Sequence, residues 1–289
     1  MLISEKPDIV LVYGDTNSTL AGALTTAKLH ISLAHIEAGL RSYNKKMPEE
    51  INRVLTDHCS DILFCPTETA VGNLRKEGFV DGVYWVGDVM YDAVLAFLPV
   101  AERKSNILNK LGLYEKSYRA KRYCLATIHR AENTDNSERL KRIFDALNSL
   151  AKDDNKIIVP LHPRTLKRMK EIKMEKLNPN LCIIEPVSYL DVLLLEKDAQ
   201  LILTDSGGVQ KEAFFLEVPC LTLREETEWV ETVESGWNRL VGTDPQRIVT
   251  AAEEIICRKS KEQANRNAYG DGQAARKIVE ICVNWLKRT

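Results

Sequence analysis

The sequence is short of several features that define large classes of proteins. No uninterrupted apolar run approaches the ~18 residues that a membrane-spanning helix needs. The start, MLISEKPD, lacks the basic and apolar regions of a secretory signal peptide. Lys and Arg number 40 and Asp and Glu number 41, so the net charge of -1 creates no overall field for nucleic acid or an anionic membrane. We therefore expect neither nucleic acid nor a membrane as a partner.

Cofactor motifs are also missing. The seven cysteines include no C-x-x-C pair, and most of them lie in apolar, strand-like surroundings. That pattern is typical of reduced, buried thiols in a cytoplasm rather than of a disulfide framework or a zinc site. His58 and Cys59 are adjacent and no ligand triad follows them, and no G-x-G-x-x-G follows a strand. The expected cofactor requirement is none, whether metal or nicotinamide.

Alternating strand and helix patterns fill the chain. Its 289 residues, 44% hydrophobic and 28% charged, suit two packed α/β domains. In the first block DIVLVY (8–13) is a continuous apolar run bounded by a turn, as in a parallel strand. SLAHIEA, ILFCPT and VYWVG are further strands, separated by helical stretches. We predict a partial N-terminal Rossmann-like domain over 1–100 and a charged interdomain connection over 101–121.

The second block repeats the pattern. RYCLATI, KIIVPL, LCIIEP, LILTD and PCLTL predict five strands with intervening helices, which form a second doubly wound sheet over 122–270. An amphipathic helix is expected over 271–289. The predicted fold class is therefore α/β, with two doubly wound Rossmann-like domains and a cleft between them. Ligands bind such sheets outside the carboxyl ends of the strands, so polar residues at strand ends are expected to line the cleft.

The segment LTDSGGVQKEAFF (203–215) is the strongest local signal. Ser206 can cap a helix, while Gly207 and Gly208 let backbone N–H groups approach a ligand closely. A helix N-terminus with free amides suits a diphosphate, and Glu212 in the first turns can accept hydrogen bonds from a ribose diol. The motif alone is equally compatible with a capped helix after a tight turn.

Three carboxylates lie where the predicted strands and helices of the first block meet. Asp15 follows the strand at 8–13, Glu37 closes an apolar strand, and Glu49 lies at a helix start. Taken singly, Asp15 is explained as a turn residue and Glu49 as a dipole-favoured helix residue. Glu37 needs a partner such as Arg41 or Arg53. Three carboxylates at the same edge of one α/β block favour a shared chemical role.

Basic residues follow the first strands of the second block. ATIHRAEN places His129 and Arg130 just past one strand, and PLHPRT places His162 and Arg164 past the next. A lone histidine is usually structural, but His-Arg pairs at two adjacent strand ends suit a rim that faces phosphate.

These motifs together resemble the non-hydrolysing UDP-N-acetylglucosamine 2-epimerases, a two-domain family with the GT-B fold. GDTNSTLAGAL, HIEAGLRS, MPEEINRVLTDH, FCPTE, TIHRAEN, LTDSGGVQKEA and REETEWVE match in the family's order and cover essentially the whole chain. The resemblance implies a catalytic group made up of Asp15, Glu37, Glu49 and His129. It also implies that UDP is held by Ser206, Gly207, Gly208 and Glu212, with Arg53 and Arg130 near the site.

The resemblance further implies a reaction. UDP leaves C1 of UDP-N-acetylglucosamine as the C2 proton is removed, and it adds back to the 2-acetamidoglucal while C2 is protonated on the other face. The product, UDP-N-acetylmannosamine, serves as a surface polysaccharide precursor. We expect a cytoplasmic homodimer that takes a UDP-N-acetylhexosamine. The residues do not decide which carboxylate is the base, and TEWVE, where other members carry an Arg-Pro pair, leaves the substituents at C3 and C6 open.

The beginning of the sequence departs from the family. Family members start with a strand and a GTRPE-like loop that contacts the diphosphate, whereas this chain begins at the strand leading to GDT. We therefore expect an incomplete N-terminal domain, with 8–13 as an apolar edge strand and the activity of the chain in doubt. Two alternatives stay open: a GT-B glycosyltransferase that uses a UDP-sugar, and an inactive truncated chain that binds UDP-sugars.

Overall fold

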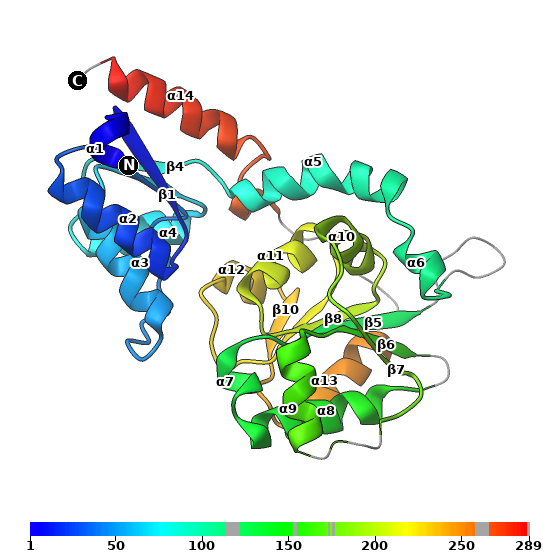
Figure 1. Ribbon diagram of the computed structural model, residues 1–289. Coiled ribbons are helices and arrows are strands. Elements are labelled where there is room, and N and C mark those ends of the chain that lie inside the picture. The colour runs from blue at the N-terminus through cyan, green and yellow to red at the C-terminus, as the bar shows by residue number, and fades with distance from the viewer. Residues whose placement is uncertain (114–121, 153–154, 173, 175–176, 258–265, 288–289) are drawn as a thin grey trace. The chain divides into compact units, whose positions relative to one another are not determined.

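A computed structural model describes residues 1–113, 122–152, 155–172, 174, 177–257 and 266–287. The chain divides into two compact units, which are described separately below. Unit 1 comprises Met1–Asp92 and Arg266–Thr289, and unit 2 comprises Ala93–Asn265 (Figure 1). Both are α/β units with parallel sheets, which confirms the predicted fold class.

Unit 1 contains a four-stranded parallel sheet in the order β1-β2-β3-β4. Its strands are β1 (Ile9–Tyr13), β2 (Ser32–Ile36), β3 (Ile62–Cys65) and β4 (Val83–Trp85). Its helices are α1 (Leu2–Glu5), α2 (Asn17–Lys28), α3 (Pro48–Cys59), α4 (Glu68–Lys76), the 3-10 helix η1 (Arg266–Tyr269) and α14 (Ala274–Leu286), together with the start of α5 (Val89–Lys104). β1 lies at one edge of the sheet, as expected for residues 8–13.

The C-terminal helix α14 completes the core of unit 1. Its residues Ile278 and Cys282 are buried in the same cluster as Ile36 of β2 and Phe64 of β3, and the helix lies beside this unit in Figure 1. The carboxylate of Asp92 accepts hydrogen bonds from the first two backbone N–H groups of α14, at 3.1 and 2.8 Å. These bonds satisfy donors that a helix start leaves open.

Unit 2 contains a six-stranded parallel sheet in the order β10-β9-β8-β5-β6-β7. Its strands are β5 (Tyr123–Thr127), β6 (Lys156–Pro160), β7 (Leu181–Ile184), β8 (Leu201–Thr204), β9 (Cys220–Thr222) and β10 (Asn238–Leu240). Its helices are the rest of α5, α6 (Ile107–Lys110), α7 (Ala131–Thr134), α8 (Ser137–Leu150), α9 (Pro163–Glu171), α10 (Tyr189–Lys197), α11 (Gly207–Phe215), α12 (Val230–Glu234) and α13 (Pro245–Cys257).

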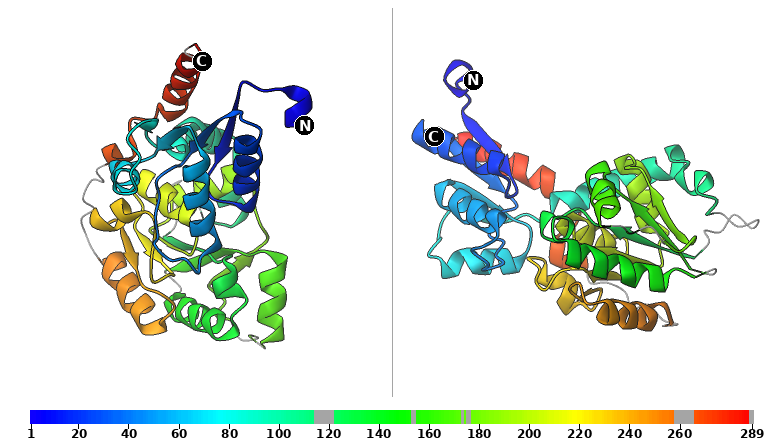
Figure 2. Two further views of the ribbon diagram at one scale, coloured as in Figure 1. Left: turned by 90° about the vertical axis from the view of Figure 1, so that its left-hand side faces the viewer. Right: turned by 60° about the horizontal axis from the view of Figure 1, so that its bottom comes forward.

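The central strands of unit 2 are buried on both faces because helices cover the sheet on each side. The green helix α8 and the orange helix α13 pack against each other on one of these faces (Figure 2). Strand β8 lies in the middle of the sheet, next to β5. The chain segments that follow these two strands therefore meet at the same carboxyl edge.

The sheet of unit 2 has one strand more than the five predicted. The additional strand, β10, contains only Asn238, Arg239 and Leu240, so it lacks an apolar run that a sequence pattern could detect. The boundary between units falls at Asp92 and Ala93 inside the continuous helix α5, whereas the connection was predicted over 101–121. Part of that predicted connection, 114–121, lies outside the described residues.

Candidate active site

In unit 1, the end of β1 and one face of α3 bring Asp15 and Arg53 together. One Nη of Arg53 donates to Oδ2 of Asp15 at 2.5 Å, and the other donates to Oε2 of Glu50 at 2.7 Å. Asn52 holds the same turn by donating to the backbone carbonyl of Asp15 at 2.9 Å. The side chain of Arg53 is 2% exposed and that of Asp15 is 29% exposed. A buried guanidinium therefore anchors a carboxylate that still reaches the surface.

The acid of α3 that pairs with Arg53 is Glu50. Glu50 is buried and accepts hydrogen bonds from the backbone and hydroxyl of Ser42 and from the backbone of Tyr43. Burial opposes its ionisation, but these bonds and the charge of Arg53 outweigh burial and hold the pKa of Glu50 below its ordinary value. Glu49 is half-buried and has no hydrogen-bond or ion-pair partner among the described residues.

Glu37 lies directly after β2 in a left-handed backbone conformation, with φ of 77°. Such a conformation costs a residue with a side chain about 1–3 kcal/mol, and it is most often kept at functional sites. The left-handed turn directs the carboxylate toward the end of β1. Its Oε2 lies 3.2 Å from the position that a Cβ would take at Gly14. Glu37 and Asp15 thus lie around the same pair of strand ends.

A buried ionic network of His35, Asp57 and Arg41 packs against these strand ends. Nδ1 of His35 lies 2.6 Å from Oδ1 of Asp57, and Nε2 of His35 lies 2.8 Å from the carbonyl oxygen of Gly14. Arg41 donates to the other oxygen of Asp57 at 2.7 Å. Burial disfavours the Asp57 charge, but His35 and Arg41 outweigh it and hold the pKa of Asp57 below its ordinary value. The network fixes the β1 and β2 loops that carry the carboxylates.

In unit 2, His129 and Asp205 meet where β5 and β8 end. Nδ1 of His129 lies 3.1 Å from Oδ1 of Asp205, and the backbone N–H of His129 donates to the same carboxylate. Asp205 is fully buried, whereas the His129 side chain is 57% exposed. Burial opposes ionisation of Asp205, but His129 and Asn133 outweigh it and hold its pKa below the ordinary value. Asp205 thus orients the imidazole and leaves Nε2 facing outward.

The next residues form the N-terminus of α11. The hydroxyl of Ser206 accepts from the backbone N–H of Val209, which confirms the predicted cap. A Cβ on Gly207 would lie 2.9 Å from Oε1 of Glu228 and 3.0 Å from Nε1 of Trp229, so only glycine fits without displacement. The first turn of α11 carries no acidic side chain. This end therefore has the geometry and dipole of an anion site.

Charged side chains surround this helix end. Arg130 lies 3.8 Å from Glu228, which is also paired with Arg224 at 3.1 Å. Glu212 of α11 is 6% exposed. Burial first, and the charge of Glu212 second, raise the pKa of the Tyr189 hydroxyl on α10. The predicted residues of unit 2 thus share one edge of the sheet. Of the second His-Arg pair, His162 caps α9 and Arg164 pairs with Asp135.

Sequence reasoning missed the buried members of both groups: Glu50, His35, Asp57 and Asp205. For α3, helical spacing could have revealed the missed acids, because Glu50, Arg53 and Asp57 lie on one face of the helix at positions i, i+3 and i+7. Asp205 directly precedes the predicted Ser206, but an acid at a strand end does not by itself reveal its histidine partner.

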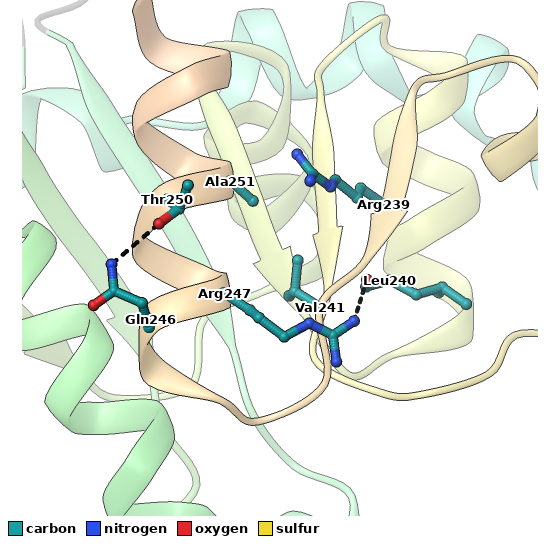
Figure 3. Close-up of a pocket in the computed structure, with 7 residues that line it drawn as sticks. All are labelled: Arg239, Leu240, Val241, Gln246, Arg247, Thr250 and Ala251. Carbon is teal, nitrogen blue, oxygen red and sulfur yellow. Dashed lines mark hydrogen bonds between the residues drawn. The ribbon is translucent and has the colours of Figure 1, made fainter.

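A different hollow lies between β10 and the start of α13 (Figure 3). It measures about 230 Å³, and two of its lining residues are Arg239 and Arg247. Arg239 pairs with Glu254 and Arg247 with Glu225, so neither guanidinium is an uncompensated charge. This hollow contains none of the predicted site residues. Within the described ranges, no group of three or more His, Cys, Asp or Glu residues is placed to hold a metal ion.

The described helices include none that is both long and apolar enough to cross a membrane.

The family model described as UDP-N-acetylglucosamine 2-epimerase matches residues 1–283. A UDP-N-acetylglucosamine 2-epimerase homolog of Methanococcus maripaludis is 52% identical over 98% of this chain and 78% of its own length.

Two further comparisons agree with that match. The UDP-2,3-diacetamido-2,3-dideoxy-D-glucuronate 2-epimerase of Pseudomonas aeruginosa is 47% identical over 97% of this chain and 76% of its own length. The crystal structure of Methanocaldococcus jannaschii UDP-GlcNAc 2-epimerase in complex with UDP-GlcNAc and UDP superposes with a TM-score of 0.88. It is 47% identical and covers 98% of this chain and 77% of that one. The chain belongs to the UDP-N-acetylglucosamine 2-epimerase family.

Proposed function

We propose that this protein interconverts UDP-N-acetylglucosamine and UDP-N-acetylmannosamine. The observation that carries the proposal is the pair of His129 and buried Asp205 directly before the N-terminus of α11. It combines an oriented imidazole with an anion-binding helix end, which is the combination that a departing nucleoside diphosphate requires. Family membership and the carboxylates of unit 1 support the same reaction.

The reaction needs groups on both faces of the sugar ring. One group removes the C2 proton as the C1–O bond to UDP breaks, so that a C1=C2 double bond forms. UDP oxygen then attacks C1 while a second group delivers a proton to the opposite face of C2. Asp15, Glu37 and Glu49 are the proposed acid and base groups, because two carboxylates in different environments can differ in protonation state. Arg53 holds Asp15 in place.

The nucleotide is proposed to bind at α11. Backbone N–H groups at Gly207 and Gly208 and the hydroxyl of Ser206 are the proposed contacts of the diphosphate, with the guanidinium of Arg130 nearby. The backbone N–H of Ser206 itself donates to the hydroxyl of Thr204. Glu212 accepts hydrogen bonds from the ribose diol. His129 neutralises the charge that develops on UDP as the C1–O bond breaks, and the elimination proposed here needs no redox step.

A second substrate deserves a direct comparison, namely UDP-2,3-diacetamido-2,3-dideoxy-D-glucuronate. The Pseudomonas aeruginosa relative named for it is 47% identical to this chain. Trp229, in the segment TEWVE, lies beside Gly207 at the proposed diphosphate site, where other members of the family carry an Arg-Pro pair. Turnover rates measured with both UDP-sugars decide between them. If the sugar with a C3 acetamido group and a C6 carboxylate turns over faster than UDP-N-acetylglucosamine, it is the substrate.

The central experiment is NMR of UDP-N-acetylglucosamine with the protein in deuterated water. Solvent deuterium is expected at C2 of both sugars, because the C2 proton leaves and is replaced from solvent-exchangeable groups. Inversion with retention of the C2 hydrogen would refute the elimination route. Transfer of the sugar to an added acceptor would favour the glycosyltransferase alternative, and UDP binding without turnover would favour the inactive chain.

Two variants separate the halves of the mechanism. Glu212→Ala is expected to weaken UDP binding by about 1.5–3 kcal/mol, since the ribose loses a charged acceptor. Glu49→Gln is expected to leave UDP affinity nearly unchanged while it abolishes turnover. Calorimetric titration with UDP, beside the deuterium assay, checks both. Loss of UDP affinity in Glu49→Gln alone would contradict the assignment.

We also propose a cytoplasmic homodimer that forms through α3. Ile51 and Leu55 on this helix are 46% and 43% exposed, and with Val54 they line an apolar hollow of about 400 Å³. Free cysteine thiols agree with a reducing compartment: none of the seven, all of them described, forms a disulfide. Leu55→Glu is expected to halve the mass measured by analytical ultracentrifugation. A monomeric native protein would refute the dimer.

A further inference from the structure

Three consecutive carbonyl oxygens at the end of β1 are each held by a side chain. They belong to Tyr13, Gly14 and Asp15, and their partners are Thr19, His35 and Asn52, at 2.6, 2.8 and 2.9 Å. The backbone N–H of Gly14 is held as well, since it donates to the carbonyl of Ile36 at 3.0 Å. The turn that carries the Asp15 carboxylate is thus fixed through its backbone, and the imidazole is the one titrating group among the three side chains.

The buried imidazole of His35 has an acceptor at each of its two ring nitrogens. At Nε2 the acceptor is the carbonyl of Gly14, which has no hydrogen to give. At Nδ1 it is Oδ1 of Asp57, at 2.6 Å. The other oxygen of Asp57 accepts from the backbone N–H of Gly39 at 3.1 Å and from Arg41 at 2.7 Å. A neutral imidazole has a single N–H, so it can donate to one of its two acceptors but not to both.

The groups around Asp57 keep it ionised. Burial opposes its charge, but His35 and then Arg41 outweigh burial and hold the pKa of Asp57 below its ordinary value. Arg41, in the loop after β2, is itself paired with Glu77, just after α4, at 2.7 Å. On β3, burial first and Asp57 second raise the pKa of the Cys65 thiol, which stays neutral. The proton between Oδ1 and Nδ1 therefore belongs to the ring, and with the proton on Nε2 it makes His35 an imidazolium.

We propose that His35 is a positioning residue whose Nε2–H holds the Gly14 carbonyl and thereby fixes the direction of the Asp15 carboxylate. The inference rests on the proposed role of Asp15 as an acid or base of the reaction. The same turn lies against the second proposed carboxylate, because Oε2 of Glu37 is 3.2 Å from the position of a Cβ on Gly14. A ring that lost one proton would keep the stronger bond to the charged Asp57 and would turn a lone pair toward the carbonyl.

Two variants divide the two hydrogen bonds between them. The amide of His35→Gln reaches the position of Nε2, so it keeps a donor to Gly14 and loses the one to Asp57. The shorter side chain of His35→Asn reaches the position of Nδ1, so it keeps a donor to Asp57 and leaves the Gly14 carbonyl without one. If His35 did no more than support the fold, His35→Gln would be the more damaging change, because buried Asp57 then loses a charged partner.

Turnover is expected in the opposite order. For His35→Asn, kcat for UDP-N-acetylglucosamine should fall at least about tenfold, as for one lost hydrogen bond that positions a reacting group. KM and the affinity for UDP should stay within about twofold of native, because the turn lies in unit 1 and the proposed nucleotide site in unit 2. For His35→Gln, kcat should stay within about threefold of native, although this variant unfolds at the lower temperature of the two.

Two readouts do not depend on turnover. Proton–nitrogen correlation spectra of protein labelled at its five histidines should show, at neutral pH, a ring with both nitrogens protonated that either variant identifies by its absence. Hydrogen exchange of a peptide covering 13–19, compared with one covering β3, should be about tenfold faster in His35→Asn than in the native protein. In His35→Gln the same ratio should stay near the native value.

Four results would overturn the inference. A native spectrum in which one ring nitrogen of His35 is unprotonated would show that the imidazolium is wrong. If His35→Asn keeps the native kcat and the native exchange at 13–19, His35 does not position the turn, and the proposed function stands. If His35→Gln loses as much turnover as His35→Asn, support of the fold explains both variants. If the native protein does not epimerise the sugar at all, the proposed function is wrong and the role in the reaction falls with it, whatever the exchange shows.

Discussion

Replacing Arg53 by methionine is expected to destabilise unit 1 strongly. The guanidinium is buried and bonds Glu50 at 2.7 Å and Asp15 at 2.5 Å. Removing one partner of a buried pair costs about 3–5 kcal/mol, because the remaining charge stays out of water. Glu50 keeps its bonds to Ser42 and Tyr43, and Asp15 can be hydrated, so we expect the lower end, about 3 kcal/mol.

Hydrogen exchange followed by mass spectrometry measures this cost within one unit. Peptides that cover β2 and β3 report the opening of unit 1, and about 3 kcal/mol corresponds to roughly a hundredfold faster exchange. The matched control is Arg276→Met on α14, in the same unit, where Arg276 pairs with Glu280 at 2.9 Å but lies exposed. It should change the opening free energy by about 0.5 kcal/mol or less.

A double variant makes the reasoning stricter. Arg53→Met combined with Glu50→Gln removes the isolated charge along with the cation, so a large part of the lost stability should return. The reasoning is refuted if Arg53→Met exchanges within threefold of the native protein, or if the double variant opens more readily than the single one.

Three other expectations follow from the site and the pKa shifts. Asp205→Asn should lower turnover at least about a hundredfold with UDP affinity little changed, because His129 loses the carboxylate that orients it; steady-state kinetics within threefold of native would contradict this. Gly207→Ala should weaken UDP binding, since its Cβ would lie 2.9 Å from a carboxylate oxygen, whereas Gly72→Ala on α4 meets no atom within 4 Å and should raise the unfolding free energy by about 0.5–1 kcal/mol. Because the pKa of Asp57 is lowered from its ordinary value of 3.8, its ionised form stabilises the folded protein above pH 3.8, and this stabilisation is lost as the pH falls further. In an acid titration, the free energy of unfolding of Asp57→Asn should therefore fall less steeply than that of the native protein.

The strands were predictable because each is a short apolar run between turn residues. LILT and SLAHI are buried on both faces, as parallel strands are, and periodicity detects that. The short strand β10 was not predictable, because Arg239 interrupts its apolar pattern. Only its pairing with β9 shows that it is a strand. Likewise, no local signal indicated that α14 packs with residues before position 93.

The site was predictable in its exposed members and not in its buried ones. Residue type and position at strand ends drew attention to Asp15, Glu37 and His129, whose catalytic roles are implied by the family resemblance and stay predictions. The pairing of Arg53 with Glu50 depends on how α3 is rotated against the sheet, which is set by tertiary packing. The left-handed backbone of Glu37 is also a tertiary effect, because glutamate seldom adopts it by itself.

The sequence order of the two units constrains how the protein folds on the ribosome. Unit 2 is continuous, so it can fold as soon as it has emerged. Unit 1 is split, and its core lacks Ile278 and Cys282 until α14 has been synthesised. Residues 1–92 are thus synthesised before unit 2 but completed only after it, because Ile36 and Phe64 lack their contacts with α14 while unit 2 is translated. Contacts between residues so distant in sequence form slowly. During synthesis, unit 1 is therefore the part of the nascent chain most in need of chaperone protection.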